Sequence, residues 1–202
     1  IYRVTKIKNV NLKKSHLAII GANNSIGSLC ARKLSDYISI MAVVDKKRDK
    51  LERLKETILH LNPIEVIIEE DAHQGVKNAD IVINTGNSPE LEFGLEDLKS
   101  NAIVCDISLS DNIFKKLRLR KDITVIRGGL IKLPYPIKVN INSGLPKGVI
   151  TACMAETMLL AFEEKFVSYS LGESMNLDRL EEIADIAVRH GFEVWVPEAP
   201  VL

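Results

Sequence analysis

The chain has 202 residues, 46% of them hydrophobic and 27% charged, and its 27 basic residues balance its 27 acidic residues. This length suits one domain with a sizeable core, and the balanced charge argues against a protein that binds nucleic acid or a membrane surface. No apolar run approaches the ~18 residues of a membrane span, and no signal peptide opens the chain. The three cysteines lack the paired spacing of a disulfide framework or a zinc site, so we expect no metal and a cytoplasmic location.

Apolar runs alternate with segments of helical periodicity through the first two thirds of the sequence. Strands are predicted at Leu17–Ile20, Ile40–Val44, Ile64–Ile68, Ile81–Asn84, Ala102–Ile107 and Ile123–Arg127, and helices at Ser25–Tyr37 and from about Leu51 to Leu61. Because the strands are apolar throughout, they indicate a parallel sheet that is covered on both faces. The predicted fold class is α/β, with a doubly wound, mostly parallel, Rossmann-like sheet.

The pattern changes after Gly129. The sequence there predicts an extended segment at Ile137–Ile141, a long helix from about Gly148 to Phe166, and a last helix at Leu177–His190 between Asn176 as N-cap and Gly191 as terminator. We therefore expect residues 1–202 to form a single domain with a C-terminal helical pair from about residue 148.

A glycine-containing loop joins the first predicted strand to the first helix. It consists of Gly21, Ala22, Asn23, Asn24, Ser25, Ile26 and Gly27. Dinucleotide-binding folds need this arrangement, because the pyrophosphate binds backbone amides at a helix N-terminus. Asn24 stands where a glycine is usual; asparagine tolerates left-handed backbone angles, but its side chain crowds the pyrophosphate. The alternative interpretation is a glycine turn that binds no nucleotide.

Asp45 follows the second strand, where an acidic side chain binds the adenosine ribose of NAD and repels the 2′-phosphate of NADP. Lys46, Lys47 and Arg48 come next and offer charges for that phosphate, or form a solvated helix start. The choice between NADH and NADPH therefore stays open. Further cofactor contacts are expected where strands end in small or polar residues, at Thr85, Gly86, Asp106, Gly128 and Gly129.

Cys153 lies inside the long predicted helix, with Glu156 and Thr157 on its face. The benefit of a helix dipole to a thiolate fades within the first turn, and Glu156 disfavours the charge. The residues alone therefore favour an inert core cysteine, and Cys30 and Cys105 have a still more structural setting.

Three separated stretches resemble the cyanobacterial long-chain acyl-[acyl-carrier-protein] reductases. They are the loop Gly21–Ser28, the segment Ala152–Leu160 with its continuation through Ser170-Leu171-Gly172, and Glu181-Glu182-Ile183 leading to Val188–Phe192. Gly128-Gly129 after a strand also matches, so the resemblance spans about Leu17 to Phe192.

The resemblance implies that Cys153 is a nucleophile, which takes an acyl group from a thioester of acyl carrier protein or coenzyme A. It further implies NADPH as the reductant that releases a fatty aldehyde, with Lys46 matching the family's phosphate-facing arginine. Asn24 and Asp45 depart from the family pattern. A third departure is the family's sizeable domain ahead of this region, which the 202 residues do not include.

Two other interpretations stay open. One is an NAD(P)-dependent dehydrogenase of a small polar substrate, similar to the cofactor domain of shikimate dehydrogenase, which needs no cysteine. The other is a nucleotide-binding domain without chemistry, suggested by Asn24 and by the missing upstream domain. The sequence also leaves the acyl chain length and a homo-oligomer undecided.

Overall fold

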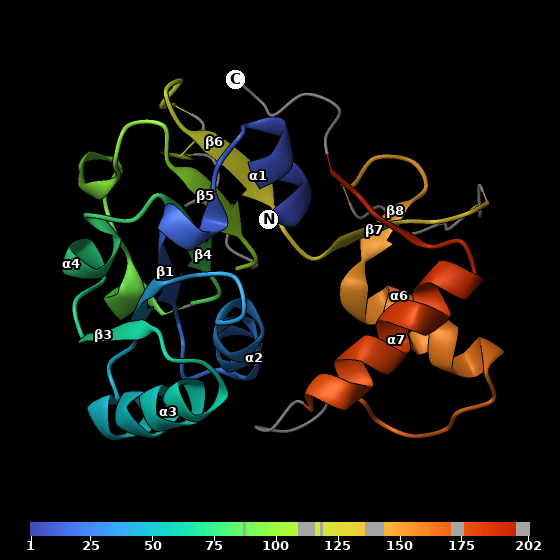
Figure 1. The fold of residues 1–202 in the computed structure, drawn as a ribbon. Coiled ribbons are helices and arrows are strands. Elements are labelled where there is room, and N and C mark those ends of the chain that lie inside the picture. Colours follow the sequence, from blue (N-terminus) through green and yellow to red (C-terminus); the bar gives the residue numbers. More distant parts are fainter. Residues whose placement is uncertain (87, 109–115, 118, 136–143, 171–175, 197–202) are drawn as a thin grey trace. The chain divides into compact units, whose positions relative to one another are not determined.

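The computed structural model describes residues 1–86, 88–108, 116–117, 119–135, 144–170 and 176–196 (Figure 1). These residues fall into two compact units that meet in sequence between Arg127 and Gly128. The predicted segment Ile137–Ile141 lies outside the described residues. Among those described, no helix combines the length and the apolar character that crossing a membrane demands.

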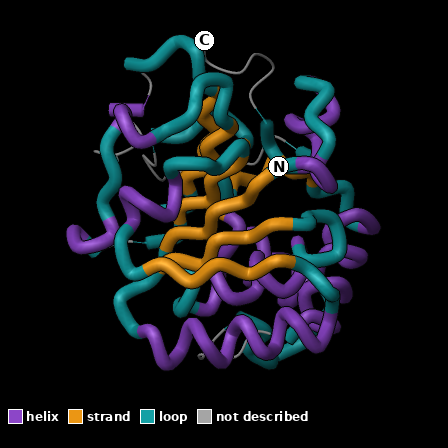
Figure 2. The backbone as a smooth tube through the Cα atoms, turned by 60° about the vertical axis from the view of Figure 1, so that its left-hand side comes forward, coloured by secondary structure: helices purple, strands orange, loops and turns teal. Residues whose placement is uncertain are grey.

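The first unit contains a sheet of six parallel strands in the order β3-β2-β1-β4-β5-β6. The strands are β1 His16–Ile20, β2 Ile40–Val44, β3 Glu65–Glu69, β4 Ile81–Asn84, β5 Ile103–Asp106 and β6 Thr124–Arg127. Figure 2 shows them side by side. This order, which reverses direction between β1 and β4, is that of the Rossmann fold and confirms the predicted fold class.

Helices precede and connect these strands. They are α1 Tyr2–Ile7, η1 Leu12–Lys14, α2 Ser25–Leu34, α3 Arg48–Leu61, α4 Ala72–Val76, η2 Pro89–Leu91 and η3 Leu95–Asp97. The sequence predicts α2 and α3 but not the others, which are short. It also continues α2 to Tyr37, whereas that helix ends at Leu34.

Both faces of the sheet are buried, which explains why its strands carry so few polar residues. Ala18 and Ile20 of β1 pack in one cluster with Ala72 and Val76 of α4. The alternate β1 residues Leu17 and Ile19 point to the opposite face and are also completely buried. Covered faces need apolar residues at successive positions, and the continuous apolar runs follow from this.

The carboxyl ends of four neighbouring strands meet at one edge of this sheet. Ile20 pairs with Val44 of β2 and Asn84 of β4, and Asn84 pairs with Asp106 of β5. In open α/β sheets, ligands bind outside this edge at the point where the strand order reverses. The register therefore gathers the loops after β1, β2, β4 and β5 into one candidate site.

The second unit combines a three-stranded antiparallel sheet, in the order β8-β7-β9, with two helices. Its elements are β7 Leu130–Lys132, β8 Val149–Thr151, α6 Ala152–Phe162, α7 Leu177–Arg189 and β9 Glu193–Val194. The helices pack through a small core that joins Ala155 and Leu159 of α6 to Ile186 of α7. The predicted helical pair is thus present, with Asn176 capping α7 and Gly191 following its end at φ 73°.

The long helix predicted at Gly148–Phe166 is wrong at both ends. Gly148 has φ 77°, and residues Val149–Thr151 form β8, which pairs with β7. The helix begins only at Ala152 and ends at Phe162. Two of the three β8 residues are β-branched apolar residues that become buried against β7, and this pairing overrides the helical periodicity.

Candidate functional site

The Gly21–Gly27 loop makes a tight turn between β1 and α2. Gly21 has φ 76°, and a Cβ atom there would lie 2.8 Å from the Cα of Gly86 after β4. A Cβ on Gly27 would lie 2.3 Å from the Gly21 carbonyl oxygen. Glycine is therefore needed at both ends of the loop, because its backbone is packed against its neighbours and, at Gly21, takes left-handed angles.

Asn24 differs from the expectation drawn from the sequence. Its backbone is extended, with φ −78° and ψ 164°, so no left-handed conformation is required of it. Its side-chain oxygen accepts a hydrogen bond from the Gly27 amide at 2.8 Å, which makes Asn24 the N-cap of α2. Its side-chain nitrogen donates to the carbonyl and hydroxyl oxygens of Thr85, at 2.9 Å and 3.0 Å.

The preference of asparagine for N-cap positions could have predicted the first of these bonds. The bonds to Thr85 depend on the tertiary pairing of β1 with β4, and the sequence carries no signal for them.

Asp45 lies beside the loop at the end of β2. One carboxylate oxygen accepts a hydrogen bond from the Asn23 amide at 3.2 Å, and the other accepts one from the Lys46 amide at 2.8 Å. Lys46 and Lys47 are exposed. Arg48 is shared between Glu70 and Glu52, at 3.2 Å and 3.4 Å. The Asp45 carboxylate is thus fixed against the loop, while the Arg48 guanidinium is paired with two glutamates.

A buried polar network closes the same edge between β4 and β5. One oxygen of the Asp106 carboxyl accepts hydrogen bonds from the Asn84 side chain at 2.9 Å and from the Ser108 hydroxyl at 2.7 Å. The Asn84 side-chain oxygen in turn accepts one from the Gly86 amide at 3.2 Å. Burial raises the pKa of the Asp106 carboxyl, and the bonds from Ser108 and Asn84 oppose that shift.

The three cysteines differ in how far they are exposed to solvent. Cys105 is buried in β5 and Cys30 is largely covered in α2, and burial raises the pKa of each thiol to about 11. Cys153, in contrast, is exposed. The core location that the residues alone favoured is therefore wrong for Cys153, because α6 begins at Ala152 and places Cys153 in its first turn, at the surface.

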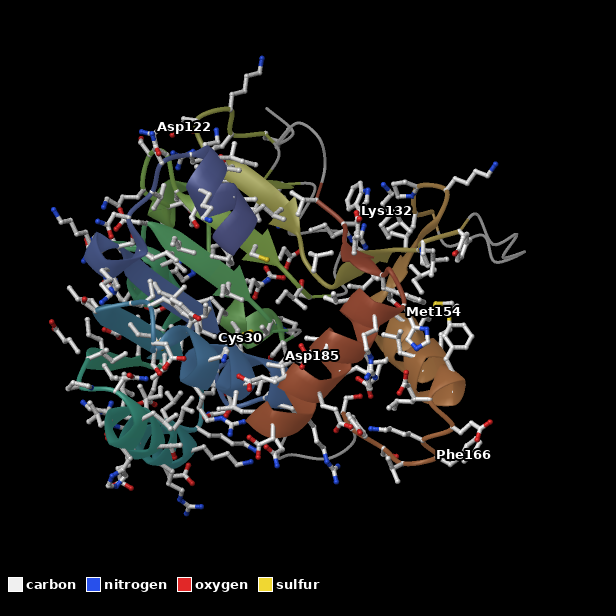
Figure 3. All side chains as sticks on the ribbon, turned by 45° about the vertical axis from the view of Figure 1, so that its right-hand side comes forward. Cys30, Asp122, Lys132, Met154, Phe166 and Asp185 are labelled. Atoms are coloured by element: carbon white, nitrogen blue, oxygen red, sulfur yellow. The ribbon has the colours of Figure 1, made fainter. Side chains whose placement is uncertain are left out.

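Cys153 lines a groove of about 620 Å³ in the second unit. The groove is lined by Cys153, Glu156, Thr157, Leu160 and Ala161 of α6 and by residues 165–170 after that helix. The Thr151 hydroxyl lies 3.0 Å from the Cys153 sulfur. Phe166, which also lines the groove, is 88% exposed on the segment that follows α6 (Figure 3).

Polar pairs fix the segment that forms the other side of the groove. Glu156 accepts a hydrogen bond from the Ser170 hydroxyl at 2.8 Å. Glu182 of α7 accepts one from the Tyr169 hydroxyl at 2.7 Å and pairs with Lys165. The groove thus combines an exposed thiol, apolar side chains and anchored polar groups.

Gly128 and Gly129, which were expected near the cofactor, belong to the second unit. Gly129 has φ 70°, and its carbonyl oxygen accepts a hydrogen bond from the Ala152 amide at 2.8 Å, at the start of α6. The other expected cofactor residues, from Gly21 to Gly27 with Asp45, Lys46, Thr85, Gly86 and Asp106, gather at the sheet edge of the first unit. Within the described ranges, no group of histidines, cysteines and carboxylates is arranged to hold a metal ion.

No protein-family model matches this chain. It is 24% identical over 198 residues to a long-chain acyl-[acyl-carrier-protein] reductase of Synechococcus elongatus, a match that covers 93% of this chain and 55% of the reductase. It is 33% identical over 102 residues to the aminotransferase PigE of a Serratia species, which covers 48% of this chain and 12% of that protein. The chain thus spans about half of the reductase and a small part of the aminotransferase.

Among solved structures, the 5-ketofructose reductase of Gluconobacter sp. strain CHM43 is similar over 91% of this chain and 60% of its own, with 12% identity and a TM-score of 0.49. The quinate dehydrogenase of Corynebacterium glutamicum in complex with NAD covers 60% of this chain and 47% of its own, with 19% identity and a TM-score of 0.47. At these scores the fold assignment rests on the strand order of the chain itself.

Proposed function

We propose that this chain belongs to an NAD(P)H-dependent oxidoreductase that reduces acyl thioesters to aldehydes through a covalent intermediate on Cys153. The observation that carries the proposal is the exposed thiol of Cys153 in the first turn of α6, on a groove lined by both apolar and polar side chains. The 24% identity to the acyl-[acyl-carrier-protein] reductase extends across nearly the whole chain and supports the same reaction class.

The first unit has the features that a dinucleotide needs. Gly21 and Gly86 pack so closely that a Cβ on Gly21 would collide, so the chain turns tightly from β1 into the N-terminus of α2, where a dinucleotide fold binds the pyrophosphate. Asp45 offers a carboxylate for the adenosine ribose, and Thr85 and Gly86 lie at the strand end where the other half of the cofactor belongs. The residues present therefore fit a nicotinamide dinucleotide.

The arrangement of charged side chains around Asp45 favours binding of NADH over NADPH. A 2′-phosphate would meet the Asp45 carboxylate, and Arg48, the strongest candidate for pairing with it, is shared between Glu52 and Glu70. Lys46 and Lys47 offer the phosphate two exposed charges, which supports residual NADPH binding.

Cys153 divides the reduction into two easier steps. Its thiol loses a proton, and the thiolate attacks the carbonyl carbon of the substrate; the bond to the donor thiol breaks, that thiol takes up a proton, and the acyl group remains on Cys153. When bound, the reduced nicotinamide supplies the hydride that releases this acyl group as an aldehyde. The groove beside Cys153 receives the acyl chain along Leu160 and Ala161. The donor is acyl carrier protein or acyl coenzyme A.

Acylation without reductant tests the proposal directly. The protein is incubated with a long-chain acyl coenzyme A, and its intact mass and peptides are measured. We expect one hydroxylamine-sensitive acyl group on the peptide that carries Cys153, and none in Cys153→Ala. Cys105→Ala, which removes a buried thiol, serves as the matched control and keeps the adduct. An adduct that persists in Cys153→Ala would overturn the proposed nucleophile.

A further inference from the structure

The side chain of Asn24 connects two parts of the candidate cofactor site that are 61 residues apart in sequence. Its oxygen binds the Gly27 amide in the first turn of α2, and its nitrogen binds the carbonyl and hydroxyl oxygens of Thr85. Both Thr85 groups lie at the end of β4, next to Gly86. One carboxamide thus joins the loop after β1 to the loop after β4.

Thr85 is itself fixed to the first strand. Its hydroxyl is buried and donates to the carbonyl oxygen of Ile20 at 2.8 Å, with the Gly21 carbonyl at 3.1 Å. The Asn24 nitrogen also lies 2.9 Å from where a Cβ of Gly21 would be, so it fills the space under the turn. The carboxamide is therefore folded beneath the loop against β4, which differs from the expected crowding of the pyrophosphate.

We propose that Asn24 is a positioning residue that sets the spacing between the pyrophosphate half and the nicotinamide half of the cofactor site. This inference rests on the dinucleotide binding in the proposed function. A dinucleotide lies across both loops, whereas each half of it contacts one. A loop with glycine at this position has no side chain to make the connection, and its spacing then depends on backbone packing alone. With Asn24 at this position, three side-chain hydrogen bonds fix the spacing between the two loops.

A ligand that spans both loops should depend on the connection more than a ligand that contacts one. Asn24→Ser keeps an oxygen that can accept from the Gly27 amide but removes both bonds to Thr85. We expect it to weaken NADH binding roughly tenfold, about 1.4 kcal/mol, and to leave the affinity for AMP within about twofold. Asn24→Gly removes all three bonds and should weaken NADH binding at least as much.

Calorimetric titration of the full chain with NADH, NADPH and AMP measures these affinities. Asn176→Ser is the matched control, because Asn176 caps α7 through the Asp178 amide and has no part in the cofactor site. It should leave all three affinities unchanged.

The outcomes separate the two proposals. NADH binding that is unchanged or tighter in both Asn24 variants would overturn the positioning role alone. An equal loss for NADH and AMP would do the same, since it would mark a general disturbance of the loop. A wild-type chain that binds neither dinucleotide would overturn the proposed function, and this inference with it.

Discussion

The Thr151 hydroxyl lies 3.0 Å from the Cys153 sulfur, at the junction where β8 passes into α6. Thr151 is the N-cap residue of α6, yet its side chain makes no capping bond to the helix backbone. The hydroxyl is instead available to the thiol, and once the thiol ionises it becomes a hydrogen-bond donor to the charged sulfur. We therefore expect the Thr151 hydroxyl to assist the reaction of the Cys153 sulfur.

Replacing Thr151 with valine should make Cys153 less reactive. A hydrogen bond of this kind contributes about 1 kcal/mol, so we expect alkylation by iodoacetamide at neutral pH to slow roughly fivefold. Thr151→Ser keeps the hydroxyl and should react at the wild-type rate. Mass spectrometry of the Cys153 peptide over time measures the rate, and equal rates for the valine and serine variants would contradict the role of the hydroxyl.

Replacing Asp45 with alanine should shift cofactor preference toward NADPH. In the proposed site the carboxylate supports the ribose of NADH and repels a 2′-phosphate, so we expect the ratio of the two affinities to change by roughly tenfold, about 1.4 kcal/mol. Asp45 also accepts hydrogen bonds from the Asn23 and Lys46 amides, and the loss of these bonds should weaken the binding of both cofactors. The ratio of the two affinities therefore isolates the contact with the ribose. Calorimetric titration with NADH and with NADPH measures this ratio, and Asp49→Ala on α3 is the control. An unchanged ratio in Asp45→Ala would show that Asp45 does not face the ribose.

Stability should depend on pH through Asp106. Because burial raises its pKa in the folded protein above that in the unfolded chain, the folded state holds the proton more tightly. Its contribution to stability is therefore present at low pH and is lost as pH rises through the folded pKa, above the ordinary aspartate value of about 3.9. Asp106→Asn removes this titration. The free energy of unfolding of the variant should therefore rise relative to that of the wild type as pH rises. Urea denaturation at pH 4.5 and 7.5 tests this; a constant difference would contradict it.

Gly21→Ala should destabilise the protein through two separable effects. Its φ of 76° strains any L residue by roughly 1–2 kcal/mol, and the new Cβ would also lie 2.8 Å from the Gly86 backbone. Gly148 has nearly the same φ of 77° but open space around it, so Gly148→Ala reports the strain alone. We expect the alanine at Gly21 to cost more free energy of unfolding than the alanine at Gly148. Equal losses would show that the Gly21–Gly86 approach relaxes without cost.

The sequence predicts the sheet of the first unit well, because its signals are local. Buried parallel strands require apolar runs, and the two strands Ile40–Val44 and Ile81–Asn84 have the bounds that their residues predict. The second unit is harder. A strand of three residues such as Val149–Thr151 owes its conformation to pairing with β7, and nothing local distinguishes it from the first turn of a helix.

That one misplaced boundary changed the interpretation of Cys153. A helix that begins at Gly148 puts the thiol in its interior, whereas a helix that begins at Ala152 puts it in the first turn. The N-cap bond of Asn24 follows from a local preference, but its bonds to Thr85 could not be predicted, since they depend on the register between β1 and β4.

β8 passes into α6 without a loop, and this limits where the chain can accept insertions or deletions. Thr151 pairs with Leu130 in the sheet and is at the same time the residue before the helix, so no loop stands between the pairing and Cys153. One residue added within β8 would shift the pairing with β7 by one position and turn the following side chains to the opposite face of the sheet, up to the residue where α6 begins. Insertions and deletions among natural relatives are therefore expected between Lys132 and Val149, and not in the three residues before the helix.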